Sequence, residues 1–308
     1  MSHLSFLLLL LSVLGTPIDE TSTASILWAR NGGGGIYMAD LQTGYRRLIA
    51  DTEYFLNGVT ADVPSQTVYW SQNNTGLILR ANWDGSSVQQ IYQTDVPNGL
   101  ATEGSNLYWC ESVWNGSTSL GRIRKSNLDG TSVQDVIQSN ELAPWQLAID
   151  PAAQELFWAD FGGGDRGYSI MRAGLDGTDI HTVIDLDHVP RSLALSPDRT
   201  KLYFVLEGAG VFRSNLDGSD IEFLLNISGG NDIEPLSLAL LADGSGMYVG
   251  TVNSIWRANL DGSNAHLFLD NTGFVQAMSI VPEPASVACC ALTLSLFCSR
   301  RRHFLPAT

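Results

Sequence analysis

Short apolar runs recur along the chain, and polar segments rich in glycine, aspartate and asparagine separate them. The runs favour aromatic and β-branched side chains, which suit the pleated surface of a β-sheet. No segment between them has the 3.6-residue periodicity of an amphipathic helix. The pattern therefore predicts an all-β protein and argues against an α/β fold.

One phrase, a basic residue followed at a fixed distance by Asp-Gly, marks a repeat. It occupies residues 80–86, 125–131, 172–178, 213–219 and 257–263, after a worn copy at 38–44. The aspartates of successive complete copies are 41 to 47 residues apart. Because glycine accepts a positive φ, we expect each Asp-Gly to form a primed hairpin turn between two strands.

Two further phrases complete the unit. An aromatic strand precedes each turn phrase, at 26–30, 68–72, 107–111, 156–160, 202–206 and 247–251. A small, apolar strand opens each unit from the second on, at 58–62, 99–103, 146–150, 192–196 and 237–241. With an outer strand after the turn, such as 88–92, each unit has the four strands of a propeller blade.

The ends of the repeat fix the number of blades. The first unit lacks an inner strand before Ile26, whereas 276–281 has the inner-strand pattern and no unit of its own. Adding this strand to the first blade removes the free edges that an open ring would expose. We predict a six-bladed β-propeller over 25–281, with four-stranded antiparallel blades, closed by the C-terminal strand in blade one.

The aromatic and Asp-Gly phrases together resemble the YWTD repeats of the low-density-lipoprotein-receptor class B family, across residues 26–281. The segment 157–160, Phe-Trp-Ala-Asp, comes nearest to the namesake motif, and the last two blades depart from it. The resemblance implies the propeller fold, and in animals such propellers bind proteins. They are followed there by a cysteine-rich module that this sequence lacks, so only the fold is carried over.

Residues 1–24 are predicted to be a secretory signal peptide. The apolar run from Leu4 to Leu14 has the length of a signal-peptide core and is too short to cross a bilayer as a helix. Small residues leave two cleavage positions open, after Gly15 or after Ala24. We therefore expect an exported protein.

The segment 282–308 resembles the PEP-CTERM sorting signal of certain Gram-negative and related bacteria. It consists of Pro282, Glu283 and Pro284, an apolar run ending at Cys298, and then Arg300, Arg301 and Arg302. The apolar run gives about 21 Å of helix, short of a ~30 Å hydrocarbon core. The resemblance implies an exosortase-type partner and a cell-surface or extracellular protein, transiently membrane-anchored through this tail. An ordinary short membrane tail stays open as an alternative.

Charge and cysteine content narrow the function further. The chain has 32 acidic and 17 basic residues, and a net charge of −15 excludes a nucleic-acid binder. Cys110 is the single cysteine outside the terminal segment, so we expect a core residue and no disulfide framework. The repeated basic residues are expected to serve their own blades by pairing with carboxylates such as Asp160: Arg80, Lys125, Arg172, Arg213 and Arg257.

Function in a propeller is expected on the loop face where the inner strands begin. The predicted ligand-binding residues are Asn57, Asn98, Trp145 and Arg191 at the inner strands, and Trp114, Phe161 and Tyr168 in the adjacent hairpins. Aromatic side chains and arginine are frequent in recognition surfaces. We expect a non-catalytic, monomeric binder of an extracellular protein or glycan.

Two other functions stay open. A metal-dependent, lactonase-like propeller hydrolase would need oxygen ligands in the central channel, where Asn57 and Asn98 are available but no carboxylate is. The sequence has no His-Glu-x-x-His or Gly-x-Ser-x-Gly motif. We expect no metal site and no cofactor, with calcium in the channel as the exception that stays open. The third possibility is a structural component of an extracellular matrix or envelope.

Overall fold

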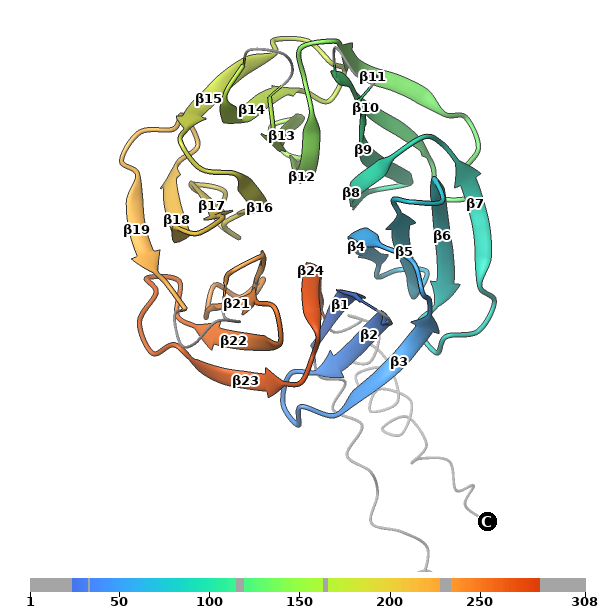
Figure 1. Ribbon diagram of the computed structural model, residues 1–308, viewed down its shortest axis with the longest axis vertical. Helices are drawn as coiled ribbons and strands as arrows, with labels where there is room; N and C mark the ends of the chain where they lie inside the picture. Colours follow the sequence, from blue (N-terminus) through green and yellow to red (C-terminus); the bar gives the residue numbers. More distant parts are fainter. Residues whose placement is uncertain (1–23, 33, 115–118, 163–165, 228–233, 283–308) are drawn as a thin grey trace, which may run out of the picture. The chain divides into compact units, whose positions relative to one another are not determined.

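The strands of the described residues form six antiparallel sheets of four strands each, arranged as blades around a central axis (Figure 1). This confirms the predicted all-β, six-bladed propeller. The computed structural model describes residues 24–32, 34–114, 119–162, 166–227 and 234–282. Most of the predicted signal peptide and sorting segment lies outside these residues. Nowhere in the described ranges is there a helix long and apolar enough to cross a membrane.

Each blade runs outward from the axis. The innermost strands are β24 (Phe274–Val281), β4 (Leu56–Asp62), β8 (Pro97–Glu103), β12 (Pro144–Asp150), β16 (Pro190–Leu195) and β20 (Ser237–Leu240). The second strands are β1 (Ser25–Asn31), β5 (Thr67–Gln72), β9 (Asn106–Trp114), β13 (Glu155–Asp160), β17 (Lys201–Leu206) and β21 (Met247–Gly250). The innermost strands correspond to the small, apolar phrase of the repeat, and the second strands correspond to the aromatic phrase.

The two remaining strands complete each blade. The third strands are β2 (Gly35–Asp40), β6 (Leu77–Asn82), β10 (Ser119–Asn127), β14 (Tyr168–Gly174), β18 (Gly210–Asn215) and β22 (Ser254–Ala258). The outer strands are β3 (Arg46–Asp51), β7 (Gln89–Gln93), β11 (Gln134–Ser139), β15 (His181–Leu186), β19 (Glu222–Leu225) and β23 (His266–Asp270).

The ring closes as predicted, in the blade that contains the first strand of the chain. Strand β24 pairs with β1 in antiparallel register, with Val281 opposite Ser25 and Met278 opposite Trp28. Blade 1 is therefore β24-β1-β2-β3, and blades 2 to 6 follow in chain order. A strand from each end of the propeller shares one sheet, so the inner edge of β1 is paired.

The core lies between the blades, where the aromatic strands pack. Trp28, Trp70, Trp109 and Trp158 are each at most 1% exposed. Tyr69 of β5 packs in one cluster with Trp109 of β9, so neighbouring blades share their buried side chains. Cys110 is fully buried, as predicted.

The strand directions define two faces of the ring. The inner strands begin at the mouth face, to which the loop between the second and third strands of each blade also returns. The Asp-Gly turns, between the third and outer strands, lie on the opposite face.

The Asp-Gly turns differ from the predicted primed type. In the turn after β6, Gly85 N donates to Asn82 O at 2.9 Å, and Asn82 N donates to Ser86 O at 2.9 Å. Gly85 has φ +85°, but none of the five aspartates before these glycines has a positive φ. The loop is therefore a type I turn followed by a left-handed glycine, which is longer than a two-residue primed turn. The Asp84 carboxylate caps it by accepting from Ser86 N at 2.8 Å.

Candidate functional site

The predicted mouth residues occupy β-bulges. Leu56 is paired with Gln72 and Gly58 with Ser71, which leaves Asn57 as the extra residue of β4. The same break in register occurs on β8, β12, β16 and β24 and places Asn98, Trp145, Arg191 and Gln276 at the equivalent position. Because a bulge redirects a side chain out of the alternating pattern, these residues are displayed at the rim of the sheet.

The two asparagines at the rim are joined to each other. Asn57 Nδ2 donates to Asn98 Oδ1 at 3.0 Å, and both side chains are buried. Asn98 Nδ2 donates to Pro144 O at 3.2 Å, and Asn73 Nδ2 donates to Asn98 Oδ1 at 3.1 Å. These bonds link blades 2, 3 and 4. The structure therefore brings Asn57 and Asn98 together, and their side-chain amides form hydrogen bonds that join neighbouring blades.

Three predicted aromatic residues converge in blade 4. The rings of Trp145 and Phe161 are stacked, with centroids 4.7 Å apart and planes 17° apart. Tyr168 meets Phe161 edge to face, with centroids 6.5 Å apart. Trp145 is in the β12 bulge, and Phe161 and Tyr168 lie at the two ends of the β13–β14 connection, so two segments at the mouth face supply one group. We call Trp145, Phe161 and Tyr168 the aromatic column; each is half-buried.

The other two predicted residues lie in the blades on either side of the column. Arg191, in the β16 bulge of blade 5, forms an ion pair with Glu207, with Nη2 2.6 Å from Oε2. Both side chains are partly exposed, so solvent screens the pair and its charges stay accessible. Trp114 ends β9 in blade 3, where its backbone is opposite Ser119. The Trp114 side chain is outside what the structure describes.

The sequence analysis missed two aromatic residues on the same face. Tyr54 and Phe55 follow β3 and precede β4, and they are 46% and 59% exposed. Two adjacent aromatic residues in a loop between an outer strand and the next inner strand could have predicted this part of the surface from the sequence. The predicted site residues lie at the start of the inner strands and in the hairpins, whereas Tyr54 and Phe55 lie in a third set of loops, between outer and inner strands.

The central channel holds a cavity of about 170 Å³, lined by all six inner strands. Its polar lining consists of Thr60, Gln146, Ser192 and Ser279, with no carboxylate among the described residues that line it. Elsewhere in the described ranges, no three His, Cys, Asp or Glu side chains converge as metal ligands would. Oxygen atoms for a calcium ion would have to come from amides, hydroxyl groups or backbone carbonyls. Among the amides, Asn98 Oδ1 already accepts two hydrogen bonds.

Two carboxylates are buried beneath the mouth face, next to the tryptophans of the aromatic strands. Asp160 accepts from Trp158 Nε1 at 2.8 Å and from Gly162 N at 2.8 Å, and burial raises the pKa of its carboxyl. Glu111 accepts from Trp109 Nε1 at 2.6 Å and pairs with two arginines of β10. These side chains lock the second strand to its neighbours.

In blade 4 the basic residue of the repeat, Arg172, serves its own blade, although not through Asp160. Arg172 pairs with Glu155, with Nη2 3.5 Å from Oε1, which corrects the predicted partner. Asp160 is taken by backbone and indole N–H groups because it lies at the other end of the same strand, β13.

Comparison with known proteins connects this geometry to one repeat type. Residues 154–195, in blades 4 and 5, match the low-density lipoprotein receptor repeat class B. Protein cueball of Drosophila grimshawi is 26% identical over 199 residues, which is 61% of this chain and 32% of that protein. A 3-hydroxyacyl-CoA dehydrogenase-like protein of Cochliobolus heterostrophus is 30% identical over 99 residues, 31% of this chain and 21% of that protein. The matched regions thus span about a third and about a fifth of these relatives.

Solved structures share the fold at low sequence identity. A chain in the crystal structure of a nidogen/laminin complex superposes with a TM-score of 0.71 and 19% identity, over 84% of this chain and 98% of that one. A putative TolB of Agrobacterium tumefaciens gives a TM-score of 0.62 and 16% identity, over 82% and 91% of the two chains. The chain is therefore a six-bladed β-propeller whose fourth and fifth blades contain a match to the YWTD-type, low-density lipoprotein receptor class B repeat.

Proposed function

We propose that this propeller is an exported, non-catalytic binding module that recognises an extracellular protein or glycan through its mouth face. The observation that carries the proposal is the aromatic column with the partly exposed Arg191–Glu207 pair in the next blade. Aromatic rings and arginine supply most of the binding energy in many recognition surfaces. Tyr54 and Phe55 add exposed apolar area to the same face.

An extracellular setting is supported by both ends of the sequence and by one structural relative. The signal-peptide pattern at 1–24 and the sorting pattern at 282–308 support export and recognition by an exosortase-type enzyme at the surface. The residues of the sorting signal are Pro282, Glu283, Pro284, Arg300, Arg301 and Arg302, and all except Pro282 lie outside the described residues. The nidogen/laminin relative comes from a complex of two proteins, which supports a protein ligand.

A binding screen of the purified full chain tests the proposal. The chain is applied to arrays of glycans and of extracellular and envelope proteins, with and without calcium. A specific hit is the expected result, with no turnover of a lactone panel and no oxidation of NADH or NADPH by the same preparation. Silence on all arrays would favour the structural matrix component, and turnover would favour an enzyme. A hit that requires calcium would indicate an ion in the channel.

A further inference from the structure

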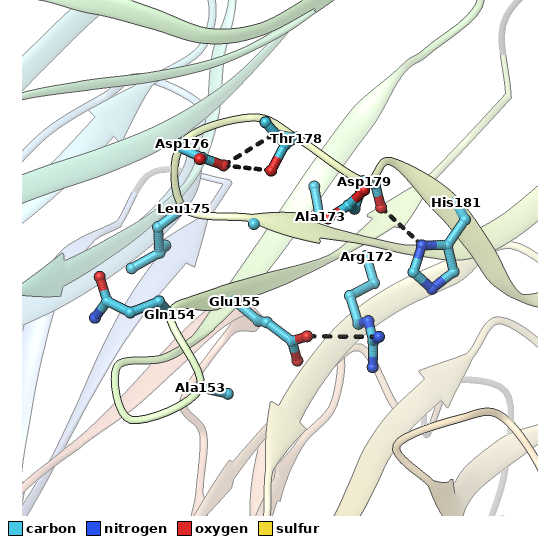
Figure 2. A pocket seen from close by; sticks show the side chains of 11 residues that line it. Ala153, Gln154, Glu155, Arg172, Ala173, Leu175, Asp176, Thr178, Asp179 and His181 are labelled. Atoms are coloured by element: carbon cyan, nitrogen blue, oxygen red, sulfur yellow. Dashed lines mark hydrogen bonds and ion pairs between the residues drawn. The ribbon is translucent and has the colours of Figure 1, made fainter.

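A polar pocket lies on the face opposite the mouth face, at the other end of the blade 4 strands from the aromatic column. Figure 2 shows this pocket, about 630 Å³ in volume, between the β12–β13 turn and the Asp-Gly turn after β14. Side chains of Glu155, Arg172 and His181 lie along one part of its wall, and Gln154 and Leu175 along another. Its volume falls within the range of small-molecule sites.

Arg172 is held differently from its counterparts in blades 2 and 5. Arg213 donates to Glu222 Oε2 at 2.8 Å on its outer strand and to a carbonyl of the next blade at 3.4 Å. Arg80 does the same with Gln89 and the next blade. In blade 4 the residue opposite Arg172 on the outer strand is His181, which offers no carboxylate or amide oxygen. The guanidinium of Arg172 rests on the ring of Phe157, 5.9 Å from its centroid.

The result is a set of groups that can both donate and accept hydrogen bonds. Among the described residues the polar partner of Arg172 is one oxygen of Glu155, so most of its five N–H groups are available to the pocket. His181 Nδ1 lies 2.7 Å from Asp179 O. A carbonyl oxygen only accepts, so Nδ1 carries the proton and Nε2 of the neutral ring is an acceptor.

The charges disfavour an anionic ligand, because Glu155, Asp176 and Asp179 line the pocket against the single positive charge of Arg172. The guanidinium donors of Arg172 require acceptor atoms on the ligand, which a simple cation does not offer. A molecule that carries no charge and offers many hydroxyl groups satisfies both sets, because each hydroxyl can accept from Arg172 and donate to Glu155 or His181. We propose that this pocket binds a neutral saccharide, at a site separate from the mouth face.

Blade 6 offers a matched control. It carries the same pair opposite each other, Arg257 and His266, and His266 Nδ1 bonds a backbone oxygen in the same way at 2.8 Å. Gly246 takes the place of Glu155 there, two residues before Tyr248, which is paired with Arg257. A histidine substitution in blade 6 therefore repeats the chemical change without the carboxylate that the proposed site requires.

The test uses the purified full chain and saturation-transfer NMR with neutral glucose-, galactose- and mannose-based oligosaccharides, with sulfated oligosaccharides as the charged comparison. The best neutral binder is then titrated by calorimetry against wild type, Arg172→Gln, His181→Ala and His266→Ala. We expect Kd to rise about tenfold or more in Arg172→Gln, because a hydrogen bond to a charged group is lost. His181→Ala should bind several-fold more weakly, and His266→Ala should match wild type.

The proposal is overturned by exclusive binding of sulfated oligosaccharides, by an absence of neutral binding, or by equal affinities of the two histidine variants. His181 and His266 are both exposed, so their comparison stands even if Arg172→Gln fails to fold. A Tyr168→Ala variant must retain this binding. That separates failure of this site from failure of recognition at the mouth face.

Discussion

The side chain of Gln146 in blade 4 donates a 2.5 Å hydrogen bond from Nε2 to the backbone oxygen of Asn57 in blade 2. The two blades are not neighbours, and Gly99 of blade 3 lies between them. A Cβ at Gly99 would come within 2.8 Å of Gln146 Cα and Cδ. The missing side chain of Gly99 thus lets one bond cross a whole blade at the mouth of the channel.

Gly99→Ala should therefore destabilise the propeller. The added methyl group must push Gln146 away from Asn57, and overpacking of this kind costs about 1–3 kcal/mol in free energy of unfolding. Urea denaturation of the variant measures the loss. Gly167→Ala is the control, since no atom lies within 4 Å of its added Cβ. Equal stability of the two variants would show that the space between Gly99 and Gln146 can accommodate a methyl group.

The Asp-Gly turns hold each blade against the preceding one, and a pair of glycine substitutions isolates that contact. Gly177 and Gly244 both have positive φ, +84° and +73°. A Cβ at Gly177 would overlap Val136 O of blade 3, whereas no atom lies within 4 Å of a Cβ at Gly244. Gly244→Ala should cost about 1–2 kcal/mol through backbone strain. Gly177→Ala should cost about 1–3 kcal/mol more through the clash. Matching losses in thermal and urea unfolding would argue against the interblade contact.

Asp160 should make stability depend on pH in an unusual direction. Burial raises the pKa of its carboxyl, so the folded state holds this proton more tightly than the unfolded state does. The stabilisation is present at acid pH and is lost as the pH rises through the raised pKa. Relative to Asp160→Asn, the wild type should therefore gain free energy of unfolding as the pH falls from about 7 to about 4. Urea denaturation of both proteins over this range measures the gap, and a constant or narrowing gap toward acid would contradict the assignment.

Cys110 should be inert in the folded protein. Burial, with the charges of Asp160 and Glu111 nearby, raises the pKa of its thiol well above the usual value, and the thiolate is the reactive form. Iodoacetamide at neutral pH should leave Cys110 unmodified in the native chain and alkylate it fully in urea. Peptide mapping distinguishes it from the three cysteines of the terminal segment. Rapid native alkylation of Cys110 would mean that blade 3 opens readily.

The blade count, the strand order and the closing strand could be read from the sequence because each depends on local repetition. The aromatic phrase around Trp158 and the Asp-Gly phrase recur once per blade. The strand pattern at 276–281, which has no unit of its own, identifies the strand that closes the ring. The mouth face could also be predicted, since inner strands and hairpins alternate in direction. The sequence therefore predicts Trp145, Phe161 and Tyr168 on one face.

The details that the sequence did not reveal depend on contacts between repeats. The bulge at Asn57 lies at the second residue of β4, so the alternating pattern of the rest of the strand, Gly58 to Asp62, does not reveal it. The conformation of the Asp-Gly loop depends on how Gly85 meets Ile49 O of the preceding blade, roughly one repeat earlier in the chain. Whether Arg172 pairs with Glu155 or Asp160 depends on which end of β13 each carboxylate occupies.

The most direct test of the account compares two tyrosines on opposite faces. Tyr168 belongs to the aromatic column, whereas Tyr45 lies in the turn between β2 and β3 and is 72% exposed. The Kd for the ligand found by the array screen is measured for wild type, Tyr168→Ala and Tyr45→Ala. Recognition at the mouth face predicts a loss of about tenfold or more for Tyr168→Ala and wild-type affinity for Tyr45→Ala. Unchanged affinity in Tyr168→Ala, or a larger loss in Tyr45→Ala, would contradict recognition at the mouth face.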